Sequence, residues 1–191
     1  DVKEHTFVTL PKEACHFGYR DSFFKQNPGR CIVTKVVFKL PKAWQARIHY
    51  ADLAKQFPAN ASPSPEEIFL AVCKIRTHKL PDPKVIGNAG SFFQNPVIPN
   101  EQYETILKTY PNLVSYPDLP GKRKLAAGWL IDQCGFKGKR MGAVGVYENQ
   151  ALVLVNHGGG TAQDILGLAK CIRDKVHDQF GVTLQIEPNI F

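Results

Sequence analysis

The segment from Thr161 to Phe180 carries signals for a helix at both of its ends. Thr161 and Asp164 form a capping pair at the start, and Gly181 can end a helix because glycine readily adopts the left-handed conformation. Apolar residues recur between them at helical spacing: Ile165, Leu168, Cys171, Ile172 and Val176. We therefore expect an amphipathic helix over 161–180, which requires a hydrophobic core to cover.

A second helix is predicted directly after the linker Ala59–Pro65. Ser64 is its expected N-cap, Pro65 its first helical residue and Glu67 the partner of Ser64 in a capping box, and Leu80-Pro81 ends it. The expected apolar stripe consists of Ile68, Phe69, Val72, Ile75 and the stem of Arg76.

The other expected elements are shorter. Helical segments are expected at 12–17, 100–109 and 124–134. Strands or extended segments are expected at 5–10, 31–40, 47–50, 113–116, 144–147, 151–156 and 182–190, with 144–147 and 151–156 forming a hairpin. Helices and strands are mixed without a repeated strand–helix–strand order, so the predicted fold class is α+β.

The composition is that of an ordinary globular protein. The 191 residues, 43% of them hydrophobic and 21% charged, allow one domain or two small ones. No apolar run approaches the roughly 20 residues that cross a bilayer, and the first residues are too charged for a signal peptide. The five cysteines lack metal or Cys-x-x-Cys spacing, and the six histidines lack ligand spacing. We expect reduced thiols, a cytoplasmic location, no membrane association and no metal site.

The net charge is +7, with lysine and arginine scattered along the chain and densest at Lys122–Lys124. A diphosphate-bearing substrate explains such a positive surface as well as a nucleic acid does. Because the basic residues form no long block, no nucleic-acid partner is expected.

The run Gly87-Asn-Ala-Gly-Ser-Phe-Phe-Gln-Asn-Pro96 is the strongest candidate for a functional turn. Glycine lets a ligand approach the backbone closely, and a turn of this kind would hold the hydroxyl of Ser91 in place. The same pattern also fits an ordinary glycine turn before a buried strand. The run by itself leaves both interpretations open.

Three further blocks accompany this run: Phe17–Ser22, Lys79–Lys84 and Lys124–Asp132. Together, in this order and at this spacing, the blocks resemble the bacterial UDP-N-acetylenolpyruvoylglucosamine reductases, which are flavin enzymes of peptidoglycan precursor synthesis. The resemblance covers nearly the whole chain. It implies an NADPH-dependent, FAD-mediated reduction of UDP-N-acetylglucosamine enolpyruvate to UDP-N-acetylmuramate.

The resemblance implies three catalytic residues. Ser91 would donate the proton that completes reduction of the double bond, and Arg20 would bind the enolpyruvyl carboxylate through its planar fork of donors. Glu187 falls on the family's catalytic glutamate when Leu184 is aligned with the family's leucine. Pro188 and Asn189 depart from the family pattern there. From the residues alone, Arg20 also fits a surface arginine paired with Asp21, and Glu187 also fits an exposed strand end.

The resemblance also implies a set of substrate-binding residues around the UDP diphosphate: Tyr50, Lys79, Asn95, Tyr116 and Gln150. Lys84 and Lys124 could equally serve a phosphate. The loop His157–Gly160 precedes a predicted helix start, where an anion could bind, but it lacks the Gly-Lys-Ser/Thr ending of a phosphate loop and is interpreted as a flexible turn.

The family's glycine-rich flavin-binding runs have no counterpart in these residues, so FAD and NADPH residues are not assigned here. By the resemblance, 1–60 is the tail of an FAD-binding domain, 61–181 a small α+β substrate-binding domain, and 182–191 a strand that returns to the FAD-binding body. A missing N-terminal FAD-binding half would then be the partner of this chain, which alone would be inactive. The alternative hypothesis is an isolated UDP-sugar-binding fragment without flavin or turnover.

Overall fold

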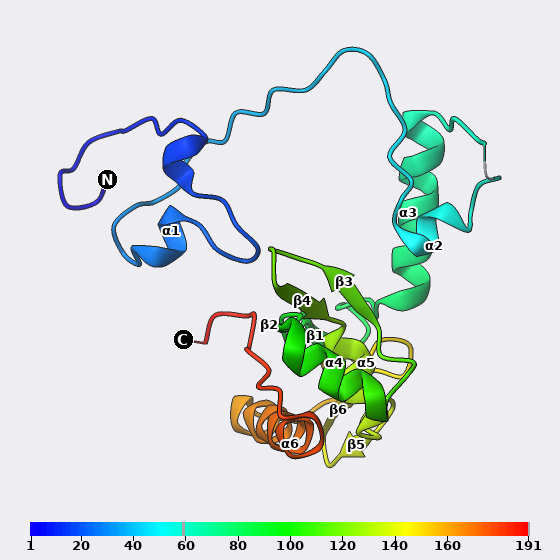
Figure 1. Ribbon diagram of the computed structural model, residues 1–191. Helices are drawn as coiled ribbons and strands as arrows, with labels where there is room; N and C mark the ends of the chain where they lie inside the picture. The colour runs from blue at the N-terminus through cyan, green and yellow to red at the C-terminus, as the bar shows by residue number, and fades with distance from the viewer. Residues whose placement is uncertain (59, 191) are drawn as a thin grey trace. The chain divides into compact units, whose positions relative to one another are not determined.

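The structure is a computed structural model that describes residues 1–58 and 60–190 and divides into two compact units, Asp1–Gln45 and Ala46–Phe191 (Figure 1). Ala59, in the expected linker, and Phe191, in the expected last segment, lie outside the described residues. Each unit is described by itself. The mixture of helices and antiparallel sheets confirms the predicted α+β class.

The first unit contains two short helical turns, η1 (Glu13–Cys15) and α1 (Phe23–Gln26). The first confirms the turn expected at 12–17. The second begins where the Ser22 hydroxyl accepts a hydrogen bond from the N–H of Lys25 at 3.4 Å.

The strands expected at 5–10 and 31–40 are wrong, because neither segment forms a strand. Their residue types favour extended backbone, but a strand also requires a neighbour to receive its backbone hydrogen bonds. In the described part of this unit no such neighbour pairs with them, and their large side chains remain in solvent, as at Phe7 (93% exposed) and Val37 (81% exposed).

The second unit begins with α2 (Ala51–Ala54) and α3 (Pro65–Lys79), which pack side by side. The capping box is confirmed: the N–H of Ser64 donates to Glu67 at 2.8 Å, and the N–H of Glu67 donates to the Ser64 hydroxyl at 3.2 Å. The strand expected at 47–50 is wrong. Tyr50 instead occupies the N-cap position of α2.

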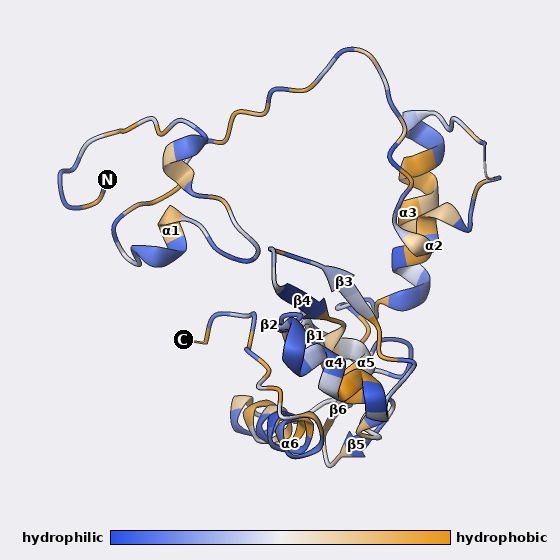
Figure 2. Cartoon of the chain, viewed as in Figure 1, coloured by the Kyte–Doolittle hydropathy of each residue, from blue (hydrophilic) through white to orange (hydrophobic). Residues whose placement is uncertain are grey.

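The expected apolar stripe of α3 is present but not buried. No residue of α3 is buried, and Phe69 and Val72 of the expected stripe are 64% and 37% exposed. Figure 2 shows the hydrophobic residues along this helix in orange.

A four-stranded antiparallel sheet has the order β1-β7-β6-β5. Its strands are β1 (Gly87–Ser91), β5 (Arg140–Met141), β6 (Val144–Val146) and β7 (Val153–Asn156). Pairing of β6 with β7, with Gly145 opposite Val155, confirms the expected hairpin.

A second sheet has the order β2-β4-β3, from β2 (Val97–Pro99), β3 (Ser115–Pro117) and β4 (Lys122–Leu125). Helix α4 (Asn100–Thr109) confirms the expected helix, and β3 confirms the expected extended segment. The helix expected at 124–134 is shorter, because Lys122–Leu125 forms the central strand of the sheet. It becomes α5 (Ala127–Gln133).

Helix α6 (Ala162–Phe180) packs against β6 and β7 of the four-stranded sheet (Figure 1). Thr161 and Asp164 form the expected capping box, and Gly181 has φ of +65°. Its buried face consists of Leu168, Ala169, Ile172, Val176 and Phe180. Cys171, which was expected on this face, is exposed.

The segment after α6 differs from expectation. In place of a strand over 182–190, the structure has an isolated bridge between Phe93 and Ile186. Val182 and Leu184 are nevertheless buried in the core that α6 covers. Over residues 1–58 and 60–190, no helix combines the length and hydrophobicity needed to cross a membrane.

Candidate functional site

Ser91 lies at the end of β1, directly after an irregularity in the pairing of β1 with β7. Asn88 pairs with Val155 and Ser91 pairs with Val153, so β1 holds one residue more than β7 between these two pairs. This is a β-bulge, and Gly90 has the positive φ of +70° that favours glycine. Ser91 is exposed. The glycine run therefore forms a bulge, and not only a turn before a buried strand.

Two aromatic residues anchor the chain behind Ser91. Phe92 and Phe93 are buried at 4% and 1% exposure, and their rings meet edge to face with centroids 5.4 Å apart. The N–H of Phe92 donates to the carbonyl of Leu152 at 2.8 Å. The exposed residue Ser91 is thus followed by a backbone segment that buried aromatic rings and a hydrogen bond hold in place.

Glu187 lies beside this anchored segment. Its N–H donates to the carbonyl of Phe92 at 2.9 Å, and the N–H of Gln94 donates to the carbonyl of Gln185 at 2.9 Å. Glu187 is half-buried. The structure therefore brings the backbone segments of two predicted catalytic residues, Ser91 and Glu187, next to each other.

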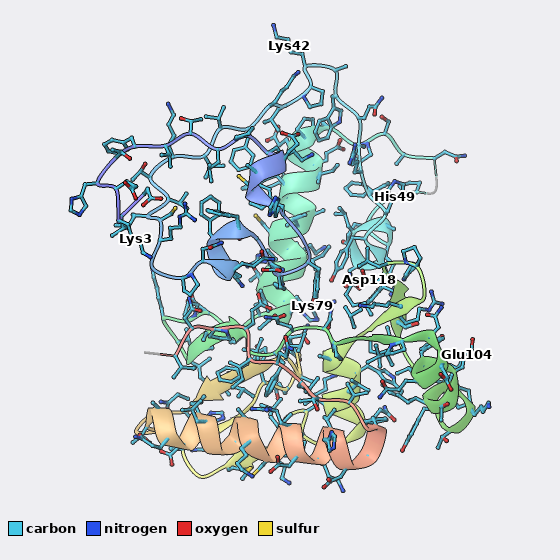
Figure 3. All side chains as sticks on the ribbon, turned by 60° about the vertical axis from the view of Figure 1, so that its left-hand side comes forward. Lys3, Lys42, His49, Lys79, Glu104 and Asp118 are labelled. Carbon is cyan, nitrogen blue, oxygen red and sulfur yellow. The ribbon has the colours of Figure 1, made fainter. Side chains whose placement is uncertain are left out.

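Lys79, the last residue of α3, is labelled in Figure 3 at the lower end of this helix. Its ammonium group donates to the carboxylate of Asp52 on α2. This hydrogen bond is the main reason why the pKa of Lys79 is raised, and burial opposes it. Interactions with Tyr50 and Tyr116 raise the pKa further. Two other predicted substrate-binding residues, Tyr50 and Tyr116, are therefore close enough to Lys79 to affect its pKa.

Asp52 is the hydrogen-bond partner of the predicted site residue Lys79, and the sequence analysis did not single it out. The hydrogen bond from Lys79 is the largest cause of its lowered pKa, and a hydrogen bond with Tyr50 contributes. The signal was present: an acidic residue soon after Tyr50 suits the first turn of a helix. Because a strand was expected at 47–50, this helix start after Tyr50 was not predicted.

Asn95 and Gln150 each lie against the first turn of α5. The side-chain oxygen of Asn95 accepts a hydrogen bond from the N–H of Ala127 at 2.9 Å. The Gln150 Oε1 lies 3.2 Å from the position that a Cβ on Gly128 would take, and it accepts from the N–H of Leu152 at 3.3 Å. The structure therefore places both predicted residues at the start of one helix.

The two rival lysines lie in different settings. Lys124 lies on β4 directly opposite Tyr116, and its ammonium is 3.8 Å from the Asp118 carboxylate. Lys84 is exposed in the turn after Pro81, where its N–H donates to Asp82 at 2.9 Å. Lys124 is therefore a neighbour of Tyr116 in the three-stranded sheet, whereas Lys84 is not part of it.

Arg20 belongs to the first unit. It has φ of +55° in the tight turn that Gly18 and Asp21 close, and its guanidinium lies 5.4 Å from the centre of the Tyr19 ring. The Asp21 carboxylate accepts from Gln26 at 2.7 Å and from the N–H of Ser22 at 2.8 Å. These bonds lower the pKa of Asp21. The role of Arg20 toward a substrate stays a prediction.

The glycine loop before α6 is already occupied by the chain itself. Asn156 Oδ1 accepts from the N–H groups of Gly158 and Gly160 at 3.0 and 3.1 Å, and Asn156 Nδ2 donates to the carbonyl of Gly160 at 2.7 Å. A phosphate at this loop would have to displace that side chain. In the part of the chain that the structure describes, no group of three or more His, Cys, Asp or Glu side chains could hold a metal ion.

Comparison with known proteins gives one family. Residues 82–191 match the family model of the UDP-N-acetylenolpyruvoylglucosamine reductase C-terminal domain. The chain is 82% identical over 190 residues to the UDP-N-acetylenolpyruvoylglucosamine reductase of Polynucleobacter asymbioticus, covering 100% of this chain and 55% of that protein. It is 52% identical over 186 residues to the reductase of Paraburkholderia phymatum, covering 95% and 54%.

Among solved structures, the UDP-N-acetylenolpyruvylglucosamine reductase of Thermus caldophilus matches with a TM-score of 0.40 and 23% identity, over 68% of this chain and 36% of that one. The chain spans about half the length of the curated relatives it matches. The resemblance seen in the sequence blocks is confirmed by the family model and by these identities. The chain belongs to the family of the UDP-N-acetylenolpyruvoylglucosamine reductase C-terminal domain.

Proposed function

We propose that this chain supplies the substrate-binding and proton-donating residues of an enzyme that reduces UDP-N-acetylglucosamine enolpyruvate to UDP-N-acetylmuramate. Membership of the reductase family supports the reaction class. The observation that carries the assignment is the hydrogen bond between the Glu187 N–H and the Phe92 carbonyl at 2.9 Å. This bond supports the proposal because it holds the backbone segments that carry Ser91 and Glu187, from distant parts of the chain, next to each other.

Diphosphate binding is proposed for Lys79 together with Tyr50 and Tyr116. The ammonium of Lys79 is charged at neutral pH, as in any exposed lysine, and its raised pKa keeps it charged well above neutral pH. Charge-assisted hydrogen bonds to phosphate oxygens are among the strongest in proteins. An incoming diphosphate carries more negative charge than the Asp52 carboxylate and would compete with it for Lys79. Asn95 and Gln150 would bind nearby polar groups of the same substrate.

Proton donation is proposed for Ser91, at the carbon that bears the enolpyruvyl carboxylate. Reduction of the double bond adds a hydride to the methylene carbon and a proton to this neighbouring carbon. The hydroxyl can donate that proton because the bulge and the two buried phenylalanines hold its backbone in place. Arg20 would stabilise the carboxylate end of the substrate as negative charge develops there. By the resemblance, Glu187 would help to polarise the same end of the substrate.

FAD and NADPH are proposed for the whole enzyme, where the flavin would supply the hydride. No described residue of this chain is assigned to either cofactor. The same proposal divides the chain into a flavin-domain tail (1–60), a substrate domain (61–181) and a returning segment (182–191). It also includes a cytoplasmic location and a role in peptidoglycan precursor synthesis.

The test uses the full-length protein that contains this chain, with Ser91→Ala. Rapid-mixing experiments separate flavin reduction by NADPH from flavin reoxidation by the enolpyruvyl substrate. We expect reduction at the parental rate and reoxidation slower by about a hundred- to ten-thousand-fold, the scale of a lost proton donor. Equal reoxidation rates in variant and parent would remove Ser91 from the mechanism.

The binding-fragment alternative is tested with the 191-residue chain alone. Five predicted substrate-binding residues lie in the second unit: Tyr50, Lys79, Asn95, Tyr116 and Gln150. An absorption spectrum shows whether the purified chain holds flavin, and calorimetric titration shows whether it binds UDP. A tightly bound flavin would refute the fragment hypothesis for the isolated chain.

A further inference from the structure

Asn88, at the start of the bulge that carries Ser91, makes three side-chain hydrogen bonds, one inside the bulge and two to the chain before it. Its side-chain oxygen accepts from the N–H of Gly90 at 3.0 Å. Its side-chain nitrogen donates to the carbonyl of Ile86 at 3.0 Å and to the carbonyl of Pro81 at 3.4 Å. One half-buried carboxamide thus joins both sides of the bulge to the segment that follows Lys79.

The bulge determines on which face of the sheet Ser91 lies. Residues directly opposite each other in an antiparallel pair share a face, as do residues two apart on one strand. Val153 and Val155 are two apart and pair with Ser91 and Asn88, so Ser91 and Asn88 share a face. In a regular strand, residues 88 and 91 would lie on opposite faces. The extra residue at Gly90 therefore sets the side on which the Ser91 side chain leaves the sheet.

We infer that Asn88 is a positioning residue for the proton donor, because it holds the bulge that aims Ser91. Glycine at position 90 gives the bulge conformational freedom, and the carboxamide of Asn88 restricts that freedom to one conformation. The bond to Pro81 also ties the bulge to the chain next to Lys79, which is proposed to bind the diphosphate. This inference rests on the proposed role of Ser91.

A residue in the same sheet, Asn156, serves as the control for a purely structural effect of losing Asn88. Asn156 on β7 also clamps a glycine segment with its carboxamide, through bonds to Gly158 and Gly160. Asn156 lies opposite Gly87 and is not among the proposed site residues. Its loss should lower stability without moving Ser91.

The experiment compares Asn88→Ala, Ser91→Ala, the double variant and Asn156→Ala in the full-length enzyme. Flavin reduction by NADPH, flavin reoxidation by the enolpyruvyl substrate and thermal unfolding are measured for each. For Asn88→Ala we expect unchanged reduction and reoxidation slower by about ten- to a hundred-fold, as for a slightly misplaced catalytic group. The double variant should be no slower than Ser91→Ala, because Asn88 acts through Ser91.

The conservative variant Asn88→Asp adds a second, milder test. It keeps an oxygen for the Gly90 N–H but loses the donor to the two carbonyls, so its reoxidation rate should lie between those of the parent and Asn88→Ala. Should Asn88→Ala fail to fold, Asn88→Asp with and without Ser91→Ala gives the same comparison.

Four outcomes would overturn the inference. Reoxidation could be slow in Ser91→Ala and parental in both Asn88 variants. Asn88 would then have no positioning role, and the proposed function would remain intact. A multiplicative loss in the double variant would mean that Asn88 acts independently of Ser91. An equal slowing in Asn156→Ala would reduce the effect to sheet stability. Parental reoxidation in Ser91→Ala would overturn the proposed proton donor as well.

Discussion

The backbone N–H of Glu187 donates to the carbonyl oxygen of Phe92 at 2.9 Å, so the end of the chain runs beside the residue that follows Ser91. Phe93 pairs with Ile186 in the same place, and Phe93 is 1% exposed. The buried residue Phe93 therefore determines which residues of the segment after Ser91 pair with the segment around Glu187. Changing the Glu187 side chain leaves this backbone contact in place.

Glu187→Gln in the full-length enzyme is expected to lower kcat by about a hundred-fold or more, because the carboxylate is proposed to act at the reacting end of the substrate. The unfolding midpoint should not change, since glutamine keeps the backbone bond to Phe92. Steady-state kinetics and thermal unfolding measure both. Glu148→Gln, at an exposed turn, is the control. A parental kcat would remove Glu187 from the site.

Lys79→Ala is expected to weaken UDP binding by about 1.5–3 kcal/mol, the scale of a lost charge-assisted hydrogen bond. Calorimetric titration of the full-length enzyme with UDP measures the change. Lys84→Ala, at an exposed lysine in the following turn, should bind UDP as the parent does. If Lys79→Ala binds normally and Lys84→Ala or Lys124→Ala binds weakly, the diphosphate contact belongs to that lysine instead.

The Asp52–Lys79 pair predicts a pH dependence of stability. The hydrogen bond from Lys79 lowers the folded-state pKa of Asp52. The contribution of Asp52 to the free energy of unfolding is therefore fully present above its unfolded-state pKa, near pH 4, and is lost as the pH falls through its folded-state pKa. The raised pKa of Lys79 means that its contribution is present below about pH 10.4 and is lost as the pH rises through the folded value. Between these limits the pair should contribute about 0.5–1 kcal/mol, because both side chains remain partly in solvent.

Denaturant unfolding of the parent and of Asp52→Asn from pH 2 to 7 measures this contribution. The difference in the free energy of unfolding should be constant at neutral pH and should shrink as the pH falls below about 4. Asp82→Asn, which changes an exposed carboxylate close to Lys79 in sequence, is the control. A difference that stays constant down to pH 2 would mean that the ion pair does not stabilise the fold.

The isolated 191-residue chain is expected to self-associate and to carry no flavin. Large apolar side chains are exposed in both units, among them Phe69 and Leu70 on α3 and Val37 and Phe38 in the first unit. Exposed apolar surface and unpaired extended segments favour association. Sedimentation velocity and the absorption spectrum test both expectations. Mixing with a separately produced N-terminal half should restore NADPH oxidation that depends on the enolpyruvyl substrate. A monomeric, fully active chain would contradict the proposed division.

The sequence by itself determined the elements whose signals are local. The capping boxes of Ser64 with Glu67 and of Thr161 with Asp164 place the starts of α3 and α6, because each side chain bonds to backbone only three residues away. The hairpin of β6 and β7 is local in the same sense. The four sequence blocks also identified the family, which the comparisons confirm.

The tertiary structure decided the features that depend on distant partners. The segments 5–10 and 31–40 have strand-forming residues but no strand to pair with, and Lys124 lies in β4 because β2 and β3 flank it. The bond from Lys79 to Asp52, the bulge that turns Ser91 and the bridge beside Glu187 are likewise absent from any local pattern. Such contacts depend on register and burial, which are settled only when segments far apart in sequence pack together.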